Sequence, residues 1–426
     1  MTEAPATLTY ASVVSRESVR IALTLAALND LEVKTANIEN AYLTAPVSDQ
    51  IWTVLGLEFG SDSGKRAIIV RALYGLKSAG ASFRNHRADC MRHLRWMPCE
   101  ADRDVWMKAK TRPSDRHTYF AYALLYVDDI FLVHHNATAA LIAIDKYFKM
   151  KEGSMGDPDF YRGSKLRKTT LANGVEAWAM SSSKYVNAAV ANVVSHLKSR
   201  GQENMMTKWA ATLFKGGYQL ELDVSEELNA EDATYFQSQI GILIWACKLV
   251  RIDLIPEVSL LASHLALLRE GHIEAVYHIF AHLRNRHNAS MCFDPTYPEI
   301  DMSDFKECDW KTFYGDMKEA VPPGTPVERV KEVDLVDSNH AGDQLTRRSR
   351  TSFFIFLNMA PVIWFSKPQP TIETSVFGTD FVAIKNCMET LRGLRYKLRM
   401  MGVQMSGPSF TYGDNMSVIH NTQRPE

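Results

Sequence analysis

Two adjacent carboxylates stand in the middle of an apolar segment. Asp128 and Asp129 follow Tyr126 and Val127, and strand-forming residues flank them on both sides over residues 124–133. This pattern predicts a β-hairpin with Val127, Asp128 and Asp129 at its tip. At a tight turn both carboxylates can approach one divalent cation, which prefers oxygen ligands. The segment therefore indicates a metal site, and an ordinary Asp-rich turn between two buried strands stays open as the alternative for the pair taken alone.

The elements that must position this hairpin form an α+β pattern. Ser15 is predicted to cap a helix, a strand runs from about residue 31 to Asn37, and helices follow over residues 81–95 and 137–148. This order predicts helices packed against one face of an antiparallel sheet.

A helical block and a separate C-terminal region follow. Helices are predicted over residues 184–197 and within 235–287, and the prolines and glycine that begin at residue 321 mark the clearest linker. Beyond this linker the sequence predicts strands over residues 333–336, 353–357, 362–365 and 410–412. It also predicts one long helix over residues 380–401.

Composition limits the classes of function. The 426 residues are 46% hydrophobic and 23% charged, which is typical of a globular chain of two to three domains. The net charge of −1 gives no overall attraction for nucleic acid, so any binding needs local basic clefts. The six cysteines form no Cys-x-x-Cys motif, which argues against zinc and against a disulfide-linked partner. With no secretory leader and no apolar run of spanning length, we expect a cytoplasmic or nuclear protein without a membrane partner.

Residues 6–197 resemble the reverse transcriptase of copia-type LTR retrotransposons. The Tyr126-Val127-Asp128-Asp129 hairpin resembles its polymerase signature, and residues 33–43 resemble its first catalytic motif. Asn37 stands where that motif has a metal-binding Asp. The resemblance implies two Mg²⁺ ions in the site, held in part by Asp128 and Asp129. It also implies an RNA template, an RNA/DNA hybrid and deoxynucleotides as partners. The residues that it implies in substrate binding are Tyr42, which would exclude a ribose 2′-OH, together with Tyr126, Gly75, Lys77 and Ser78.

The C-terminal region resembles the ribonuclease H of the same elements. The resemblance implies metal-binding and catalytic roles for Asp337, Asp380 and Asp414, with Asp380 standing where the family has Glu. A basic cluster lies at residues 346–350. In a ribonuclease H context it could hold the backbone of an RNA/DNA hybrid, and the alternative is a solvated loop.

The resemblance implies an α+β fold with a palm-type polymerase domain, a helical thumb and connection region, and a ribonuclease H-like α/β domain. The expected boundaries are residues 1–170 for the polymerase domain, 171–320 for the thumb and connection region, 321–332 for the linker and 333–426 for the ribonuclease H-like domain. The first and last domains are expected to be truncated.

Asn37 is expected to impair RNA-directed DNA synthesis. An amide carries no charge for the metal ions, and losing a bridging carboxylate costs about 4 kcal/mol, or about a thousandfold in rate. The alternative is a non-catalytic retroelement remnant that at most binds nucleic acid.

Overall fold

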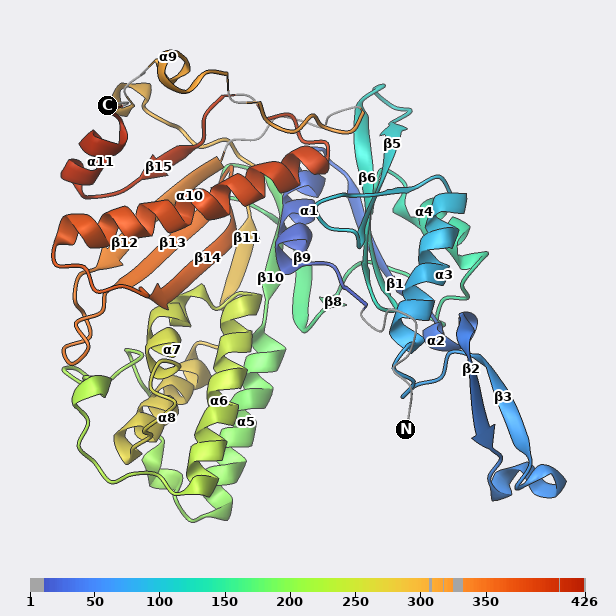
Figure 1. Ribbon diagram of the computed structural model, residues 1–426, viewed down its shortest axis with the longest axis horizontal. Coiled ribbons are helices and arrows are strands. Elements are labelled where there is room, and N and C mark those ends of the chain that lie inside the picture. Colours follow the sequence, from blue (N-terminus) through green and yellow to red (C-terminus); the bar gives the residue numbers. More distant parts are fainter. Residues whose placement is uncertain (1–10, 306–308, 317, 325–331, 406, 425–426) are drawn as a thin grey trace. The chain divides into compact units, whose positions relative to one another are not determined.

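The computed structural model describes residues 11–305, 309–316, 318–324, 332–405 and 407–424. The chain forms two compact units (Figure 1). The first unit contains Met1–Pro158, Ala320–Arg329 and Tyr396–Gln404, and the second contains Asp159–Glu319, Val330–Arg395 and Met405–Glu426. Of the expected linker at 321–332, residues 325–331 lie outside the described residues, and residues 321–324 have no helix or strand.

A five-stranded antiparallel sheet forms the centre of the first unit. Its order is β1-β7-β6-β5-β4, with bounds Glu32–Asn37, Asp129–His134, Thr118–Tyr126, Val105–Thr111 and Met97–Pro98 respectively. Residues 119–125 of β6 and 130–133 of β7 are each at most 1% exposed. Because alternate residues of a strand point to opposite faces, both faces of this hairpin are covered.

Helices and a separate hairpin complete the first unit. Helix α1 (Arg16–Leu28) contacts β1, β6 and β7, and the predicted cap is confirmed, because the Ser15 hydroxyl accepts from the backbone N–H of Ser18. Helix α4 (Ala137–Asp145) contacts β1 and β7. The remaining elements are α2 (Ala41–Thr44), β2 (Pro46–Val54), η1 (Leu57–Asp62), β3 (Arg66–Arg71) and α3 (Ala79–His93). Strands β2 and β3 form a two-stranded sheet that extends away from the five-stranded sheet (Figure 1).

The second unit begins with a sheet and a helical cluster. Its first sheet is antiparallel in the order β11-β10-β9-β8, with bounds Ser290–Phe293, Glu176–Ser181, Ser164–Thr170 and Phe160–Tyr161. Four helices pack around one apolar core, α5 (Ser183–Ser199), α6 (Ala230–Leu249), α7 (Ile255–Leu261) and α8 (Glu270–Asn285). Short helices join these elements, η2 (Glu203–Met205), η3 (Leu220–Leu222), η4 (Ile252–Leu254), η5 (Met302–Asp304) and α9 (Trp310–Tyr314).

A mixed sheet completes the second unit. Its order is β14-β13-β12-β15, with bounds Ala360–Pro368, Arg350–Leu357, Glu332–Asn339 and Phe410–Tyr412. Strands β12 and β15 are parallel, and the other pairs are antiparallel. The predicted strands are confirmed, and the long helix α10 (Val376–Met400) begins four residues before its predicted start at Asp380. Helix α11 (Met416–Thr422) follows β15.

Candidate functional site

The predicted carboxylate hairpin is present, and its turn is strained. Tyr126 of β6 pairs directly with Asp129 of β7, so Val127 and Asp128 form a two-residue loop. Val127 has a φ of 52°, which is unfavourable for a β-branched side chain. A positive φ at the first loop position is typical of a type II′ turn, whose twist suits a hairpin. Such strain persists only where the surrounding structure holds it in place.

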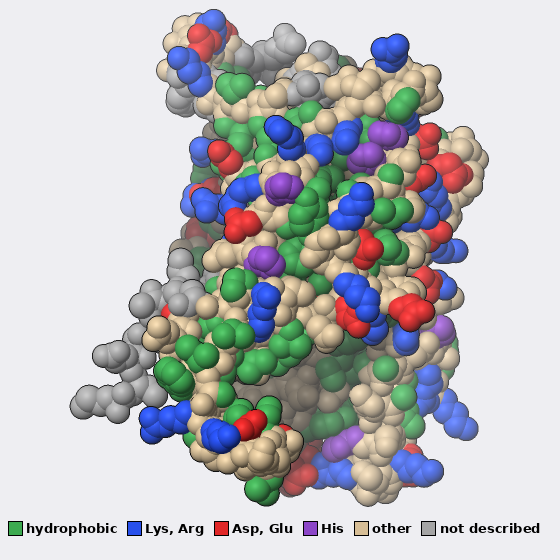
Figure 2. Space-filling model, turned by 90° about the vertical axis from the view of Figure 1, so that its right-hand side faces the viewer, with side chains coloured by type: hydrophobic (Ala, Val, Ile, Leu, Met, Phe, Trp, Pro, Cys, Tyr) green, Lys and Arg blue, Asp and Glu red, His purple; other side chains and the backbone are tan. Residues whose placement is uncertain are grey.

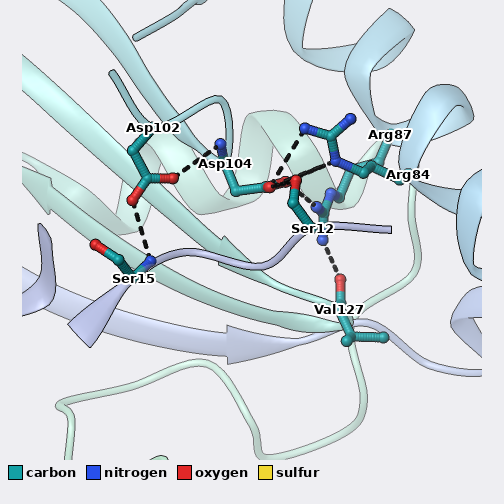
Figure 3. Close-up of polar contacts among 7 residues, drawn as sticks. All are labelled: Ser12, Ser15, Arg84, Arg87, Asp102, Asp104 and Val127. Atoms are coloured by element: carbon teal, nitrogen blue, oxygen red, sulfur yellow. Dashed lines mark hydrogen bonds and ion pairs between the residues drawn. The ribbon is translucent and has the colours of Figure 1, made fainter. Parts of the chain in front are cut away.

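A buried ion pair holds this turn (Figure 3). Arg87 of α3 donates through Nη1 to the carbonyl of Val127 and through Nη2 to Asp104 Oδ1, at 3.2 Å for the second bond. The side chains of Arg87 and Asp104 are 5% and 2% exposed. Arg84 Nε lies 3.1 Å from Asp104 Oδ1, and the Ser12 hydroxyl also donates to Asp104. Because buried charges are tolerated only when paired, this network fixes the carbonyl immediately before Asp128.

Sequence reasoning missed this network. Arg84 and Arg87 lie three residues apart on α3, a spacing that is equally typical of a solvated helix face. Their partners lie 17 to 40 residues further along the chain, and no local pattern links them.

Asn37 lies beside one carboxylate of the hairpin. The antiparallel register of β1 and β7 places Asn37 opposite Asp129, and Asn37 Nδ2 donates to Asp129 Oδ1 at 2.7 Å. The amide faces the carboxylate with its N–H group because the opposite orientation would place two oxygen acceptors against each other. Asp128 is tied to the same region by its carbonyl, which accepts from the backbone N–H of Ile38 at 2.9 Å.

The donor set does not fit a two-ion site. Carboxylates suit Mg²⁺, but Asn37 directs a hydrogen-bond donor at Asp129 where the resemblance implies a third carboxylate. Glu39, the nearest acidic residue along the chain, pairs instead with Lys149 at 2.7 Å. Within the residues that the structure describes, no group of three or more His, Cys, Asp or Glu side chains is arranged to hold a metal ion.

The predicted substrate-binding residues lie in two places. Tyr126 pairs with Asp129 at the hairpin itself. Tyr42 lies on α2, where its ring is 4.8 Å from that of Tyr74 between centroids. The other three surround the start of α3, where Gly75 has a φ of 95°, Lys77 is exposed and Ser78 is buried.

The three C-terminal aspartates surround one small cleft. Asp337, Asp380 and Asp414 come from β12, α10 and the residues just after β15. Asp380 is buried and accepts from the Ser338 hydroxyl and from Asn415 Nδ2, at 2.8 Å for the amide. Burial raises the pKa of Asp337, and the negative charges of Asp414 and Asp380 raise it further. The structure thus brings together the three residues that the sequence singled out, and neutral donors satisfy one of them.

The surface charge is mixed. On the face in Figure 2, Lys and Arg side chains are interspersed with Asp and Glu, so neither sign dominates that face. None of the helices in the described part of the chain combines the length and the hydropathy that a bilayer span requires.

Comparison with known proteins identifies the family that this part of the chain resembles. Residues 6–195 match the family model described as "Reverse transcriptase (RNA-dependent DNA polymerase)", a match that includes β1 and the carboxylate hairpin. The chain carries a reverse transcriptase domain. Beyond that class, nearly the whole chain is related to copia-type retrovirus-related Pol polyproteins of plant transposons.

Three relatives illustrate this relationship. The chain is 23% identical to the Retrovirus-related Pol polyprotein from transposon TNT 1-94 of Nicotiana tabacum, over 96% of this chain and 28% of that protein. It is 20% and 19% identical to the Pol polyproteins from transposons RE2 and RE1 of Arabidopsis thaliana, each over 98% of this chain and 25% of the relative. The chain therefore spans about a quarter of the length of these relatives.

Proposed function

We propose that this chain is the reverse transcriptase and ribonuclease H region of a copia-type retrotransposon Pol polyprotein, and that Asn37 impairs its polymerase site. The observation that carries the proposal is the 2.7 Å hydrogen bond from Asn37 Nδ2 to Asp129 Oδ1. In this arrangement a neutral donor satisfies the carboxylate, so the position adds no negative charge to attract a cation.

The architecture supports this assignment. The five-stranded sheet and its carboxylate hairpin serve as the polymerase palm, and helices α5 to α8 serve as the thumb and connection. The mixed sheet with α10 serves as the ribonuclease H-like domain, because it gathers Asp337, Asp380 and Asp414 at one cleft. The partners would then be an RNA template, an RNA/DNA hybrid and deoxynucleotides.

The chain's own residues would position the nucleic acid. Reverse transcriptases generally use Mg²⁺, which supplies charge stabilisation during phosphoryl transfer. Arg87 and Asp104 fix the turn that carries Asp128, and the pairing of β1 with β7 fixes Asn37 against Asp129. The geometry of the hairpin is thus retained while one charge is replaced by an amide.

Primer extension on an RNA template tests the proposal. We compare the wild type, Asn37→Asp, and Asn85→Asp, which adds the same charge at an exposed position of α3. Restoring the carboxylate should raise the extension rate by up to about a thousandfold, which corresponds to about 4 kcal/mol, whereas Asn85→Asp should change nothing. A wild type that extends the primer as fast as Asn37→Asp would refute the impairment.

A silent Asn37→Asp variant would favour the alternative, a remnant that at most binds nucleic acid. Binding of an RNA/DNA hybrid that weakens steeply with salt would then identify the retained activity.

A further inference from the structure

Arg350, the first residue of β13, is a largely buried cation without an ion-pair partner in the described part of the chain. Its Nη1 donates to Ser259 Oγ at 2.5 Å, and its Nη2 lies 3.4 Å from Ser263 Oγ. Asp343 attracts the guanidinium only from beyond ion-pair distance. Burial lowers the pKa of Arg350 to about 10. A buried guanidinium normally has a carboxylate or another anion beside it, because desolvating an unpaired charge is costly.

Arg350 opens onto a pocket of about 410 Å³ in the second unit. This volume lies within the range of small-ligand sites. A guanidinium has five N–H donors, and only two of those of Arg350 have acceptors among the described residues. Its Nε forms no hydrogen bond with a described residue and is not among the buried unpartnered atoms, so this donor is accessible. The other polar side chains of the pocket include Arg348, Ser263, His264, Asn339 and Ser352, and its carboxylates are Glu221, Asp337 and Asp343.

Two of the three carboxylates of the pocket accept hydrogen bonds from backbone N–H groups. Asp343 Oδ1 accepts from the N–H groups of Leu345 and Thr346, at 3.0 and 2.8 Å. Glu221 Oε1 accepts from the N–H of Gln344 at 3.3 Å. These contacts hold the loop between β12 and β13, and within the described part of the chain neither Asp343 nor Glu221 forms an ion pair with Arg350. The planar fork of a guanidinium matches two oxygens of a phosphate, so the unmet donors suit that group.

We propose that Arg350, with Arg348, binds a phosphate group in this pocket. The source is a nucleic-acid backbone or a small phosphate-bearing molecule, and the nucleic-acid source rests on the proposed function. Asp337 lines the same pocket, so a backbone phosphate at Arg350 would lie beside the aspartate cleft. Of the three arginines in the basic cluster at residues 346–350, Arg348 and Arg350 line the pocket, and the exposed Arg347 does not.

Two variants and one matched control test this site. Arg350→Met removes the fork and the charge, Arg350→Lys keeps the charge without the fork, and Arg347→Met removes a charge from the same loop outside the pocket. Arg350→Met should fold with an unchanged or higher Tm, because it removes a buried charge that has no ion-pair partner. The first arm measures the Tm with inorganic phosphate, and the second measures fluorescence anisotropy with a labelled RNA/DNA hybrid.

Phosphate should raise the Tm of the wild type and of Arg347→Met, but not that of Arg350→Met. Hybrid affinity should fall about tenfold in Arg350→Met, by less in Arg350→Lys, and about twofold or less in Arg347→Met. An Arg350-dependent response to phosphate alone supports the site and identifies a small molecule as the source. If neither ligand depends on Arg350, or if Arg347→Met matches Arg350→Met, the proposal is overturned. Primer extension by Asn37→Asp tests the proposed function separately.

Discussion

Replacing Asn37 by Asp should destabilise the protein when no divalent cation is present. The substitution exchanges a hydrogen bond of 2.7 Å to Asp129 for two carboxylates at nearly the same separation. Two unit charges about 3 Å apart repel by roughly 1.5 kcal/mol in water and by roughly 5 kcal/mol at an effective dielectric of about 20. Both residues are half-buried, and a hydrogen bond to a charged group contributes about 1.5 kcal/mol. Proton uptake by one carboxylate limits the loss, so we expect about 3 kcal/mol at pH 7.

Urea unfolding in EDTA measures this loss, with Asn85→Asp as the control for added charge. The difference between Asn37→Asp and the wild type should shrink as the pH falls, because the paired carboxylates then bind a proton. Added Mg²⁺ should stabilise Asn37→Asp more than the wild type, because only the variant offers a third carboxylate. If Asn37→Asp is as stable as the wild type in EDTA at pH 7, the 2.7 Å contact does not hold Asp129 as we infer.

Three further perturbations test the hairpin and the aspartate cleft. Asp104→Asn should cost about 3 to 5 kcal/mol in urea unfolding, because it leaves the buried Arg87 without its carboxylate. Arg87→Met should cost less, because Arg84 still pairs with Asp104, and the double variant should cost less than the sum of the two. Val127→Gly should raise the free energy of unfolding by about 1 kcal/mol, since relief of the positive φ exceeds the entropy cost of glycine; a loss would show that the turn is unstrained. The raised pKa of Asp337 shows that the folded state disfavours its charged form, so Asp337→Asn should raise the Tm at pH 7. Because Asp337 is exposed, the gain should be equivalent to less than about 1 kcal/mol. The gain should vanish in acid, where Asp337 is protonated in both the folded and the unfolded state.

A fourth prediction concerns pH dependence. Burial lowers the pKa of His134 to about 4, and its Nδ1 accepts from the backbone N–H of Asn136 at 2.8 Å. A folded-state pKa below the unfolded value means that the stabilisation is present above about pH 6.5 and is lost as the pH falls toward 4. We expect a loss of about 2 to 3 kcal/mol over that interval, measured by urea unfolding. His134→Gln, which keeps an acceptor without titrating, should flatten the dependence, and an unchanged pH profile would contradict the assignment.

The strands that carry the carboxylate hairpin could be predicted from the sequence, because the pattern of apolar residues that forms them is local. The apolar run around Asp128 and Asp129 predicts the β6–β7 hairpin because a strand buried on both faces leaves no room for charge except at its end. Local patterns were less successful at helix ends. The apolar spacing continues to Phe148, but α4 ends at Asp145, whose side chain accepts from the backbone N–H of Met150 and holds the chain in a turn.

The contacts that hold the site depend on register and long-range packing. The amino-acid sequence does not indicate that Arg87 donates to the carbonyl of Val127. Nor does it indicate that Arg350 has no carboxylate within ion-pair distance among the described residues. Asn37 was recognised as a substitution from the sequence, but its hydrogen bond to Asp129 follows only from the pairing of β1 with β7.

The two carboxylate clusters share one feature and differ in its consequence. In each cluster a side-chain amide donates to a carboxylate, Asn37 to Asp129 and Asn415 to Asp380. Asn37 replaces a carboxylate of its cluster, and its backbone is fixed on both sides, by β7 and by the N–H of Lys151. Asn415 replaces nothing, because all three aspartates of its cluster are present, and its side chain is also held as the cap of α11, where its Oδ1 accepts from the N–H groups of Ser417 and Val418. The amide is therefore a loss of charge at the hairpin, whereas at the C-terminal cleft it is a second neutral donor to Asp380 beside the Ser338 hydroxyl and leaves all three aspartates in place.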